Sequence, residues 1–324
     1  MIATTPSRIS LTELYSALPE WREFEAFYAQ TLRSAVYRNS WLLEKLGSFI
    51  LRRGGKKVRP LLLLYTAKAA GQITPLSYVG GVLIELLHNA TLVHDDVIDD
   101  SNYRRGFFSL RGLWGNRIAV LFGDWLLARG LLLSLKYKAP ELLYYTSEAV
   151  EALTEGELLQ LKRMRTGSVS IQEYFEVIEK KTAALFQAAC CMGAWTAEAS
   201  SAVIDTAAEL GKTIGIAFQI RDDLLDWGDS ACTGKPTDSD RQQKRFTLPL
   251  LWAFSQLSAS EKRALLRLPF SDARRRLHDL GAFDYAESVL QTYAQRAHSL
   301  ASDLPNSTAV PIHALLDMLI FRSQ

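Results

Sequence analysis

The sequence predicts an all-α protein. Apolar residues recur at intervals of three and four through most of the chain, for example in segments 11–18, 142–161 and 174–195, and this spacing is typical of helices with one buried face. Alternation with a period of two, which marks β-strands, is scarcely present, and the short apolar runs are rich in Leu and Ala. The composition is even along all 324 residues, so we expect one large helical domain spanning residues 1–324.

Helix ends are expected where Gly, Pro and charged residues gather. These breakers leave roughly ten helices and lie at residues 53–55, 71–75, 104–106, 166–167, 228–244, 269–271 and 304–307. Residues 1–24 show the Leu spacing of short amphipathic helices and lack the apolar core of a signal peptide. Segment 118–135 is the most hydrophobic, but Asp124 and Arg129 interrupt it, which predicts a buried bundle helix and no membrane-crossing segment.

Charge and cysteine content narrow the possible partners and the compartment. Lys and Arg total 37 against 35 Asp and Glu, a formal net charge of +2, so no overall field attracts nucleic acid or anionic lipid. The cysteines are three, and the adjacent Cys190 and Cys191 are poorly placed for a disulfide. We therefore expect a protein of the reducing cytoplasm, in which these two residues pack as small apolar side chains.

Two aspartate clusters carry the strongest chemical signal. They consist of Asp95, Asp96 and Asp99, and of Asp222, Asp223 and Asp226. Each cluster follows an apolar helical segment, and the spacing of four residues puts its first and last carboxylates on one helix face. Mg²⁺ prefers such oxygen ligands and binds through one or two carboxylates together with substrate phosphates. One such cluster alone is usually a solvated helix face, but two alike predict a magnesium site for a phosphorylated substrate.

Basic residues lie where a diphosphate would need them. They are Lys56, Lys57 and Arg59, the pair Arg104 and Arg105 just after the first cluster, Lys180 and Lys181, and Lys235. A solvated position explains Lys57 and Lys180 equally well, whereas an arginine pair beside a metal site favours bidentate phosphate binding. His88 lies two helical turns before the first cluster and His94 flanks it, so either can contact substrate, although His94 is equally well explained as a core residue. Zinc is not expected, because no Cys and His set has ligand spacing.

These motifs resemble those of the all-trans isoprenyl diphosphate synthases over nearly the whole chain, most closely the long-chain octaprenyl and solanesyl type. The matching segments, in the family's order, are GGKKVRP, LLHNATLVHDDVIDDSNYRRG, GDWLLARG, EGELLQ, EKKTAALF, FQIRDDLLDWGDSACTGKPTDSD and TLPL. The resemblance implies a helical bundle of the isoprenoid synthase type with a central apolar cavity. It also implies a prenyltransferase that joins isopentenyl diphosphate to an allylic diphosphate such as farnesyl diphosphate by ionisation, condensation and elimination.

The resemblance also assigns roles to individual residues. Three Mg²⁺ ions would bind the allylic diphosphate through Asp95, Asp96, Asp99, Asp222 and Asp226. The same diphosphate would contact Arg104, Lys181, Gln219 and Lys235, and isopentenyl diphosphate would contact Lys56, Arg59, His88 and Arg105. Dipoles of the Lys181 carbonyl, Thr182 and Gln219 would stabilise the allylic cation, and Asp223 would support the metal ligands from behind. Where the family usually has lysine before Thr-Leu-Pro, this chain has Arg245, which can still bind phosphate.

Product length is expected to depend on the first acidic helix. In the family, aromatic residues at the fourth or fifth position before the first Asp stop chain growth early, and here these positions are Thr91 and Ala90. The next large residues towards the helix start are Leu87 and Ile84. We therefore expect an all-trans product of roughly seven to nine isoprene units in an apolar tunnel, used for quinone side chains.

Other functions fit the sequence less well. A short-chain farnesyl or geranylgeranyl diphosphate synthase is the nearest alternative. A terpene cyclase typically carries an Asn/Ser/Glu metal motif where this chain has DDLLD, and a non-catalytic partner subunit would have lost its acidic motifs. A di-iron bundle would need Glu-x-x-His pairs. By resemblance, the expected assembly is a homodimer.

Overall fold

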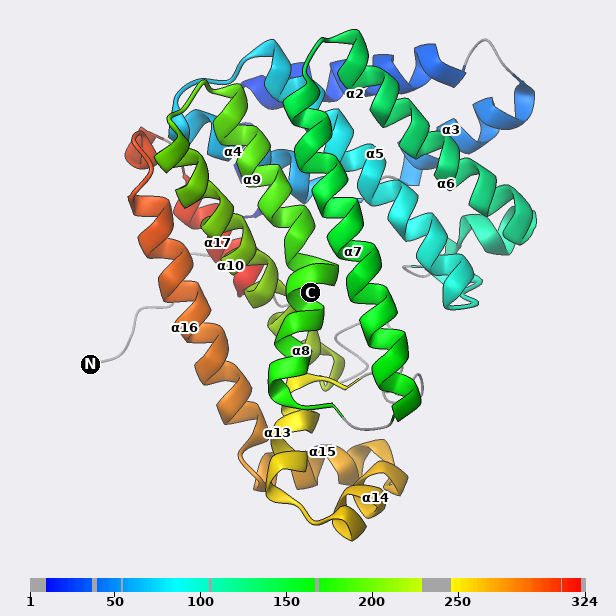
Figure 1. Cartoon of the computed structure of the whole chain (residues 1–324), viewed down its shortest axis with the longest axis vertical. Helices are drawn as coiled ribbons and strands as arrows, with labels where there is room; N and C mark the ends of the chain where they lie inside the picture. The colour runs from blue at the N-terminus through cyan, green and yellow to red at the C-terminus, as the bar shows by residue number, and fades with distance from the viewer. Residues whose placement is uncertain are drawn as a thin grey trace.

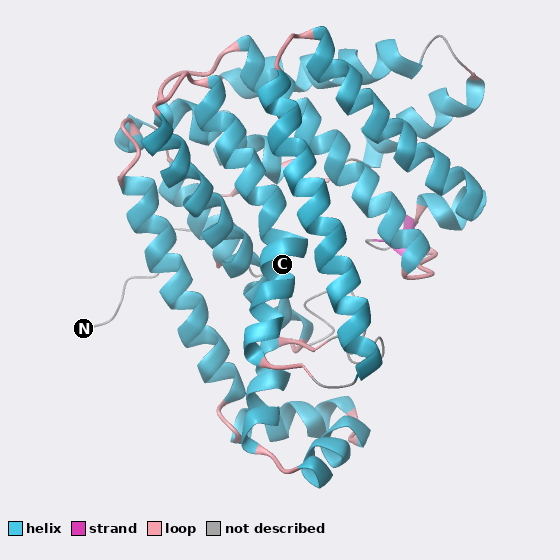
Figure 2. Cartoon of the chain, in the orientation of Figure 1, coloured by secondary structure: helices cyan, strands magenta, loops and turns pink. Residues whose placement is uncertain are grey.

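The computed structural model describes residues 10–36, 40–53, 55–104, 107–166, 169–228, 246–309 and 311–321, and nearly all of them lie in helices (Figure 2). Within these ranges the only strands are β1 (Tyr103–Arg104) and β2 (Phe107–Phe108), which pair antiparallel. The prediction of an all-α protein is therefore confirmed.

The helices form a bundle whose long members run side by side (Figure 1). The N-terminal helices are α1 (Leu11–Ser16), α2 (Glu20–Val36) and α3 (Trp41–Arg53). The bundle itself contains α4 (Val58–Ala70), α5 (Pro75–Ile98), α6 (Leu110–Lys136), α7 (Pro140–Thr166), α8 (Ile171–Ile178), the π-helix η1 (Glu179–Ala183), α9 (Ala184–Thr196) and α10 (Ser201–Asp226). The C-terminal part contains α13 (Leu248–Gln256), α14 (Ala259–Arg267), α15 (Phe270–Asp279), α16 (Ala282–Ser302), the 3₁₀ turn η2 (Ser307–Ala309) and α17 (Ile312–Ile320).

The described residues contain more helices than the roughly ten that the breakers predict. At two of the missed boundaries a residue other than Gly forms a tight turn. Lys138 ends the connection from α6 to α7 with φ 52°, and Glu198 lies between α9 and α10 with φ 58°. Both residues adopt the left-handed conformation that Gly usually supplies. The turn at Glu198 leaves little trace in the sequence, whereas Pro140, the first residue of α7, marks the boundary after Lys138.

Helices α4 and α5 form the centre of the main core. Leu61, Leu62, Leu63 and Leu64 are all fully buried on α4, so this helix is enclosed on every side. Helix α5 is long and apolar enough to cross a membrane by length and composition, but 72% of that stretch is buried inside the bundle. It is therefore a core helix that ends at the first aspartate cluster.

Helix α6 passes the same test of length and composition, yet only 39% of its apolar stretch is buried. Leu121, Leu132 and Leu135 are 68%, 55% and 62% exposed. The prediction that segment 118–135 is buried is therefore wrong for one face of the helix. The sequence pattern missed this because an apolar residue that faces solvent looks the same in sequence as one that faces the core.

A second, smaller core lies at the end of the bundle where α13, α14 and α15 gather (Figure 1). Trp227, directly after α10, is buried there and stacks on Phe270 with ring centroids 5.4 Å apart. The indole Nε1 of Trp227 donates to Thr247 Oγ1 at 2.9 Å. The end of α10 is thereby fixed against the start of α13.

A histidine pair joins α16 to α17 and predicts a pH effect on stability. His298 Nδ1 and His313 Nδ1 lie 2.8 Å apart, and His298 Nε2 is 2.9 Å from Asp317 Oδ1. A hydrogen bond between two Nδ1 atoms requires one of the imidazoles to be neutral. Burial and the neighbouring His298 lower the pKa of His313, although Asp317 opposes them.

Because the pKa of His313 is lower in the folded than in the unfolded chain, the unfolded chain binds more protons as the pH falls through about 6.5. The free energy of unfolding is therefore expected to decrease between about pH 7.5 and pH 5.5. Urea unfolding of the wild type and of His313→Gln at both pH values checks this. The variant is expected to lose less stability than the wild type, and an equal loss in both would contradict the role of the pair.

Candidate active site

The first aspartate cluster lies at the C-terminal end of α5. Asp95 and Asp96 belong to its last turn, and Asp99 is the C-cap, with its backbone N–H bonded to the Asp95 carbonyl at 2.8 Å. The C-terminal end of a helix carries partial negative charge. Carboxylates at this end are therefore repelled by the helix as well as by one another, and a cation relieves both effects.

The second cluster repeats this arrangement on α10. Asp226 is the last residue of the helix, Asp222 lies one turn earlier, and both are half-buried. Asp223 is buried, and its carboxylate accepts hydrogen bonds from Gln219 Nε2 at 3.0 Å, Tyr174 Oη at 2.8 Å and Leu248 N at 2.9 Å. Asp223 thus joins α8, α10 and α13 and lies behind the cluster.

A π-helix lies between the two clusters. The residues of η1, Glu179–Ala183, interrupt a helix that otherwise runs on from α8 into α9. Lys181 forms an ion pair with Glu157 of α7, and its Nζ is 3.0 Å from Gln160 Oε1. Thr182 Oγ1 instead donates to Gln219 Oε1 of α10 at 2.8 Å. The π-helix therefore presents a cation to α7 and a hydroxyl to Gln219, which lies just before the second cluster on α10.

The electrostatics of Asp95 connect the π-helix to the first cluster. The pKa of Asp95 is raised to about 6, mainly by burial; Lys181 and Arg104 oppose the rise, and the neighbouring Glu157 and Asp99 contribute to it. Lys181, Glu157 and Asp95 are therefore close neighbours, although they come from three different helices. A carboxylate that is hard to ionise when isolated is well suited to a site that fills with cations.

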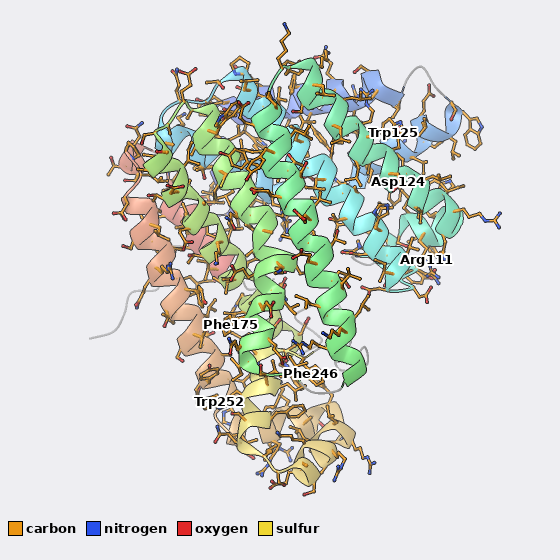
Figure 3. The ribbon with its side chains drawn as sticks, viewed as in Figure 1. Arg111, Asp124, Trp125, Phe175, Phe246 and Trp252 are labelled. Carbon is orange, nitrogen blue, oxygen red and sulfur yellow. The ribbon has the colours of Figure 1, made fainter. Side chains whose placement is uncertain are left out.

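Two arginines hold the segment after the first cluster. Arg104 Nε donates to Asp96 Oδ1 at 2.8 Å, and this carboxylate is buried. Burial raises the pKa of Asp96, and Arg104 opposes this. Arg111, labelled in Figure 3, donates to Asp100 Oδ1 at 2.7 Å and to Asn102 Oδ1 at 3.0 Å. Arg104 is thus at the cluster as predicted, whereas the positioning role of Arg111 was missed.

A separate cationic group lies at the start of α4. Arg59 Nη1 is 3.1 Å from His88 Nε2 of α5, and the guanidinium lies 4.6 Å from the centre of the Phe186 ring. Lys56 is exposed, and its carbonyl accepts the hydroxyl of Tyr15. Of the residues predicted to contact isopentenyl diphosphate, Arg59 and His88 are therefore brought together, and Lys56 lies just before α4. The fourth, Arg105, lies outside the described residues, as do Lys235 and Arg245.

Several neighbours of the predicted residues have structural partners. Lys57 forms an ion pair with Glu25 at 2.9 Å, and Lys180 forms one with Glu155 at 2.5 Å. His94 Nε2 lies 3.3 Å from the Val120 carbonyl of α6 and 3.4 Å from Asp124 Oδ1, which Figure 3 labels. These contacts favour the surface and packing interpretations that the sequence left open.

The predicted chain-length residues lie along α5 before the first cluster. Ala90, Leu87 and Ile84 are buried, and Thr91 is half-buried with its hydroxyl bonded to the His88 carbonyl at 2.9 Å. A cavity of about 400 Å³ in the structure lies elsewhere, between the end of α10 and α15, and is lined by residues such as Trp227, Arg274 and Phe283. The tunnel along α5 remains a prediction.

The donor set fits magnesium better than a tightly chelated metal. Among the described residues, no three His, Cys, Asp or Glu side chains converge closely enough to hold an ion by themselves. Carboxylates at two separate helix ends, with Lys181 and Arg104 between or beside them, suit an ion that binds through a shared diphosphate. The arrangement is that of an all-helical enzyme acting on diphosphates.

Comparison with known proteins identifies the family. The family model described as polyprenyl synthetase matches residues 40–276. The octaprenyl diphosphate synthase of Escherichia coli is 32% identical over 280 residues, which cover 82% of this chain and 85% of that protein. The nonaprenyl diphosphate synthase of Mycobacterium tuberculosis is 32% identical over 322 residues, covering 92% and 95%. The geranylgeranyl diphosphate synthase of Saccharolobus solfataricus is 30% identical over 315 residues, covering 90% and 93%.

Solved structures agree with this assignment. The polyprenyl synthase of Caulobacter crescentus, solved with calcium and isoprenyl diphosphate, has a TM-score of 0.87 at 29% identity and covers 99% of this chain and 100% of its own. The chain belongs to the polyprenyl synthetase family. It is a trans-prenyltransferase with the isoprenoid synthase fold, and members of the family use a divalent metal with diphosphate substrates.

Proposed function

We propose that this enzyme condenses isopentenyl diphosphate with an allylic diphosphate, farnesyl diphosphate being the expected primer, and releases a long-chain all-trans polyprenyl diphosphate. The observation that carries the proposal is the π-helix between two acidic helix ends, with Lys181 beside Asp95 of one and Thr182 bonded to Gln219, which precedes the other. A second cationic group, Arg59 with His88, provides for a second diphosphate. A terpene cyclase acts on a single diphosphate substrate and does not need a second diphosphate site.

The residues present suit three Mg²⁺ ions held by Asp95, Asp96, Asp99, Asp222 and Asp226. When bound, the ions neutralise charge on the leaving diphosphate. Lys181 and Arg104 add cationic hydrogen-bond donors to the same group, so the allylic C–O bond can ionise. Thr182 and Gln219 orient dipoles towards the cation. The isopentenyl double bond then attacks it, a new C–C bond forms, and the proton lost from the adduct passes to the released diphosphate.

The long product is proposed from the small residues before the first cluster. Ala90 and Thr91 cannot close a channel, and several relatives are octaprenyl, nonaprenyl or heptaprenyl diphosphate synthases. Geranylgeranyl diphosphate synthases are also near, so a short-chain product is the alternative. We further propose that residues 1–324 act as one unit in the cytoplasm and that the product supplies quinone side chains.

One incubation separates the candidate functions. Purified protein is mixed with Mg²⁺, labelled isopentenyl diphosphate and farnesyl diphosphate, and the products are analysed by chromatography and mass spectrometry. A ladder of linear polyprenyl diphosphates ending at a defined long chain supports the proposal. A cyclic hydrocarbon would indicate a cyclase, and no product from the pure chain would indicate a subunit that needs a partner.

A homodimer is proposed from the exposed apolar face of α6 and α7. Leu121, Leu132 and Leu135 on α6 and Leu158 on α7 are all more than half exposed. Two copies of such a face can bury each other about a twofold axis. No other part of the described surface presents as many exposed leucines.

The dimer predicts the effect of a charge on this face. Leu132→Glu is expected to shift the protein to the monomer, because a carboxylate would lose its hydration in the interface. Leu266→Glu is a matched control, since Leu266 is 41% exposed but lies on α14. Analytical ultracentrifugation of the three proteins measures the result. A monomeric wild type, or a Leu132→Glu variant that stays dimeric, contradicts the proposed interface.

A further inference from the structure

Two glycines on different helices lie directly against the π-helix. A Cβ atom added to Gly156 of α7 would be 2.8 Å from Lys181 N and 3.0 Å from Lys180 Cβ. A Cβ atom added to Gly215 of α10 would be 2.4 Å from Ala183 Cα and 2.8 Å from Ala183 Cβ. Carbon atoms do not approach this closely without a shift of the backbone. Both helices therefore contact η1 at a distance that only Gly permits.

The reason lies in the geometry of the π-helix. A π-turn closes its hydrogen bonds over one more residue than an α-turn, so the backbone bulges out of the helix axis. In η1, the backbone at Lys181 lies against α7 and the backbone at Ala183 lies against α10. If either glycine carried a side chain, η1 would lack space. The segment from α8 to α9 would then have to become a regular α-helix or move away from its neighbours.

The position of the bulge determines where the reactive side chains lie. Lys181 reaches Glu157, the residue after Gly156, and influences Asp95. Thr182 reaches Gln219, one turn beyond Gly215 on α10. On α7, Gly156 directly precedes the partner of Lys181, and on α10, Gly215 lies one turn before the partner of Thr182. A shift of η1 would break both contacts and move Lys181 relative to Asp95.

We propose that Gly156 and Gly215 are positioning residues that hold the π-helix between the two acidic clusters, so that Lys181 and Thr182 meet the allylic diphosphate. This inference rests on the proposed function for the identity of the substrate. The glycines themselves contact no substrate and act only through η1. Their replacement is expected to weaken allylic diphosphate binding without a matching effect on isopentenyl diphosphate.

The test uses Gly156→Ala and Gly215→Ala, with Gly193→Ala as the matched control. A Cβ on Gly193 of α9 would lie 2.5 Å from the Leu63 carbonyl, a clash of similar severity on the side of α9 that faces α4. Thermal unfolding followed by circular dichroism records how much stability each variant loses. Calorimetry with Mg²⁺ and a non-ionising thiolo analogue of farnesyl diphosphate then measures binding at a temperature where all are folded.

The two π-helix variants are expected to bind the analogue about ten- to a hundredfold more weakly than the wild type, because small misplacements in such sites have effects of this size. The control should change the affinity by less than about threefold even where it loses equal stability. Hydrogen exchange should be faster in peptides covering 179–183 only in the first two variants.

Three results would overturn the proposal. The first is equal loss of affinity in Gly193→Ala and the π-helix variants, and the second is unchanged affinity in both π-helix variants. The third is a failure of both to fold while Gly193→Ala folds, because the glycines would then be general packing requirements. Failure of the proposed function would show separately, as a wild type that makes no polyprenyl product, and the hydrogen-exchange comparison would still decide the role of the glycines.

Discussion

Replacement of Asp95 or Asp222 by alanine is expected to lower turnover by about three orders of magnitude or more while the protein stays folded. Each residue lies about one turn before the end of an apolar helix, and neither belongs to the apolar core. Their carboxylates are proposed to hold ions on the leaving diphosphate, so their removal should destabilise the transition state of ionisation. Steady-state kinetics with saturating Mg²⁺ and circular dichroism measure the two effects separately.

Two neighbouring aspartates are controls for this prediction. Asp100 is next to the first cluster, but its side chain is 82% exposed and paired with Arg111, so Asp100→Asn should keep near-native turnover. Asp223→Asn should mainly reduce stability, because an amide has one acceptor oxygen and cannot accept all three of the bonds from Tyr174, Gln219 and Leu248 that the carboxylate accepts. Near-native turnover of Asp95→Ala or Asp222→Ala would show that the two-cluster mechanism is wrong.

Ala90→Phe is expected to shorten the main product from roughly seven to nine isoprene units to roughly three or four. The growing tail would run from the metal site along α5, where Ala90 is fully buried. The next large residues, Leu87 and Ile84, lie about 12 and 17 Å from Asp95 at about 1.5 Å per residue. A phenyl ring at position 90 would therefore meet the tail long before the wild-type limit. Mass spectrometry of the products measures chain length directly.

A smaller substitution tests whether the effect depends on side-chain volume. Ala90→Val should give products of intermediate length, because it fills less of the same space. The claim fails if the wild type itself stops at three or four units. A long product from Ala90→Phe would show instead that the channel does not pass this residue and that its end lies on other helices.

The sequence was sufficient to predict the class of fold and the acidic ends of α5 and α10. Both follow from local signals, since the apolar periodicity and the spacing of Asp95 to Asp99 can be recognised without knowledge of tertiary contacts. Arg104 could also be placed, because it follows the first cluster by only a few residues. The relation of His88 to Arg59 depended on resemblance, and the structure brings them to 3.1 Å.

Other parts of the site depend on distant contacts and have no local signal. The segment EKKTA reads as a regular α-helix, and nothing in it indicates a π-turn. Glu157 lies in a helix with ordinary apolar spacing, and its pairing with Lys181 appears only when α7 is packed against η1. Tyr174 likewise becomes recognisable only through its hydroxyl bond to Asp223. Burial, together with Asp223, raises the pKa of Tyr174 well above its usual value.

The two helices that end in carboxylates also have a consequence for how long the protein survives. Charges at the negative ends of α5 and α10 lower the free energy of unfolding until cations and diphosphate bind. A ligand present at about a hundred times its dissociation constant adds about 2.7 kcal/mol to the free energy of unfolding. Transient opening, and with it proteolysis, should therefore be most frequent when substrate is scarce. Supply of precursors would then regulate the amount of enzyme as well as its rate.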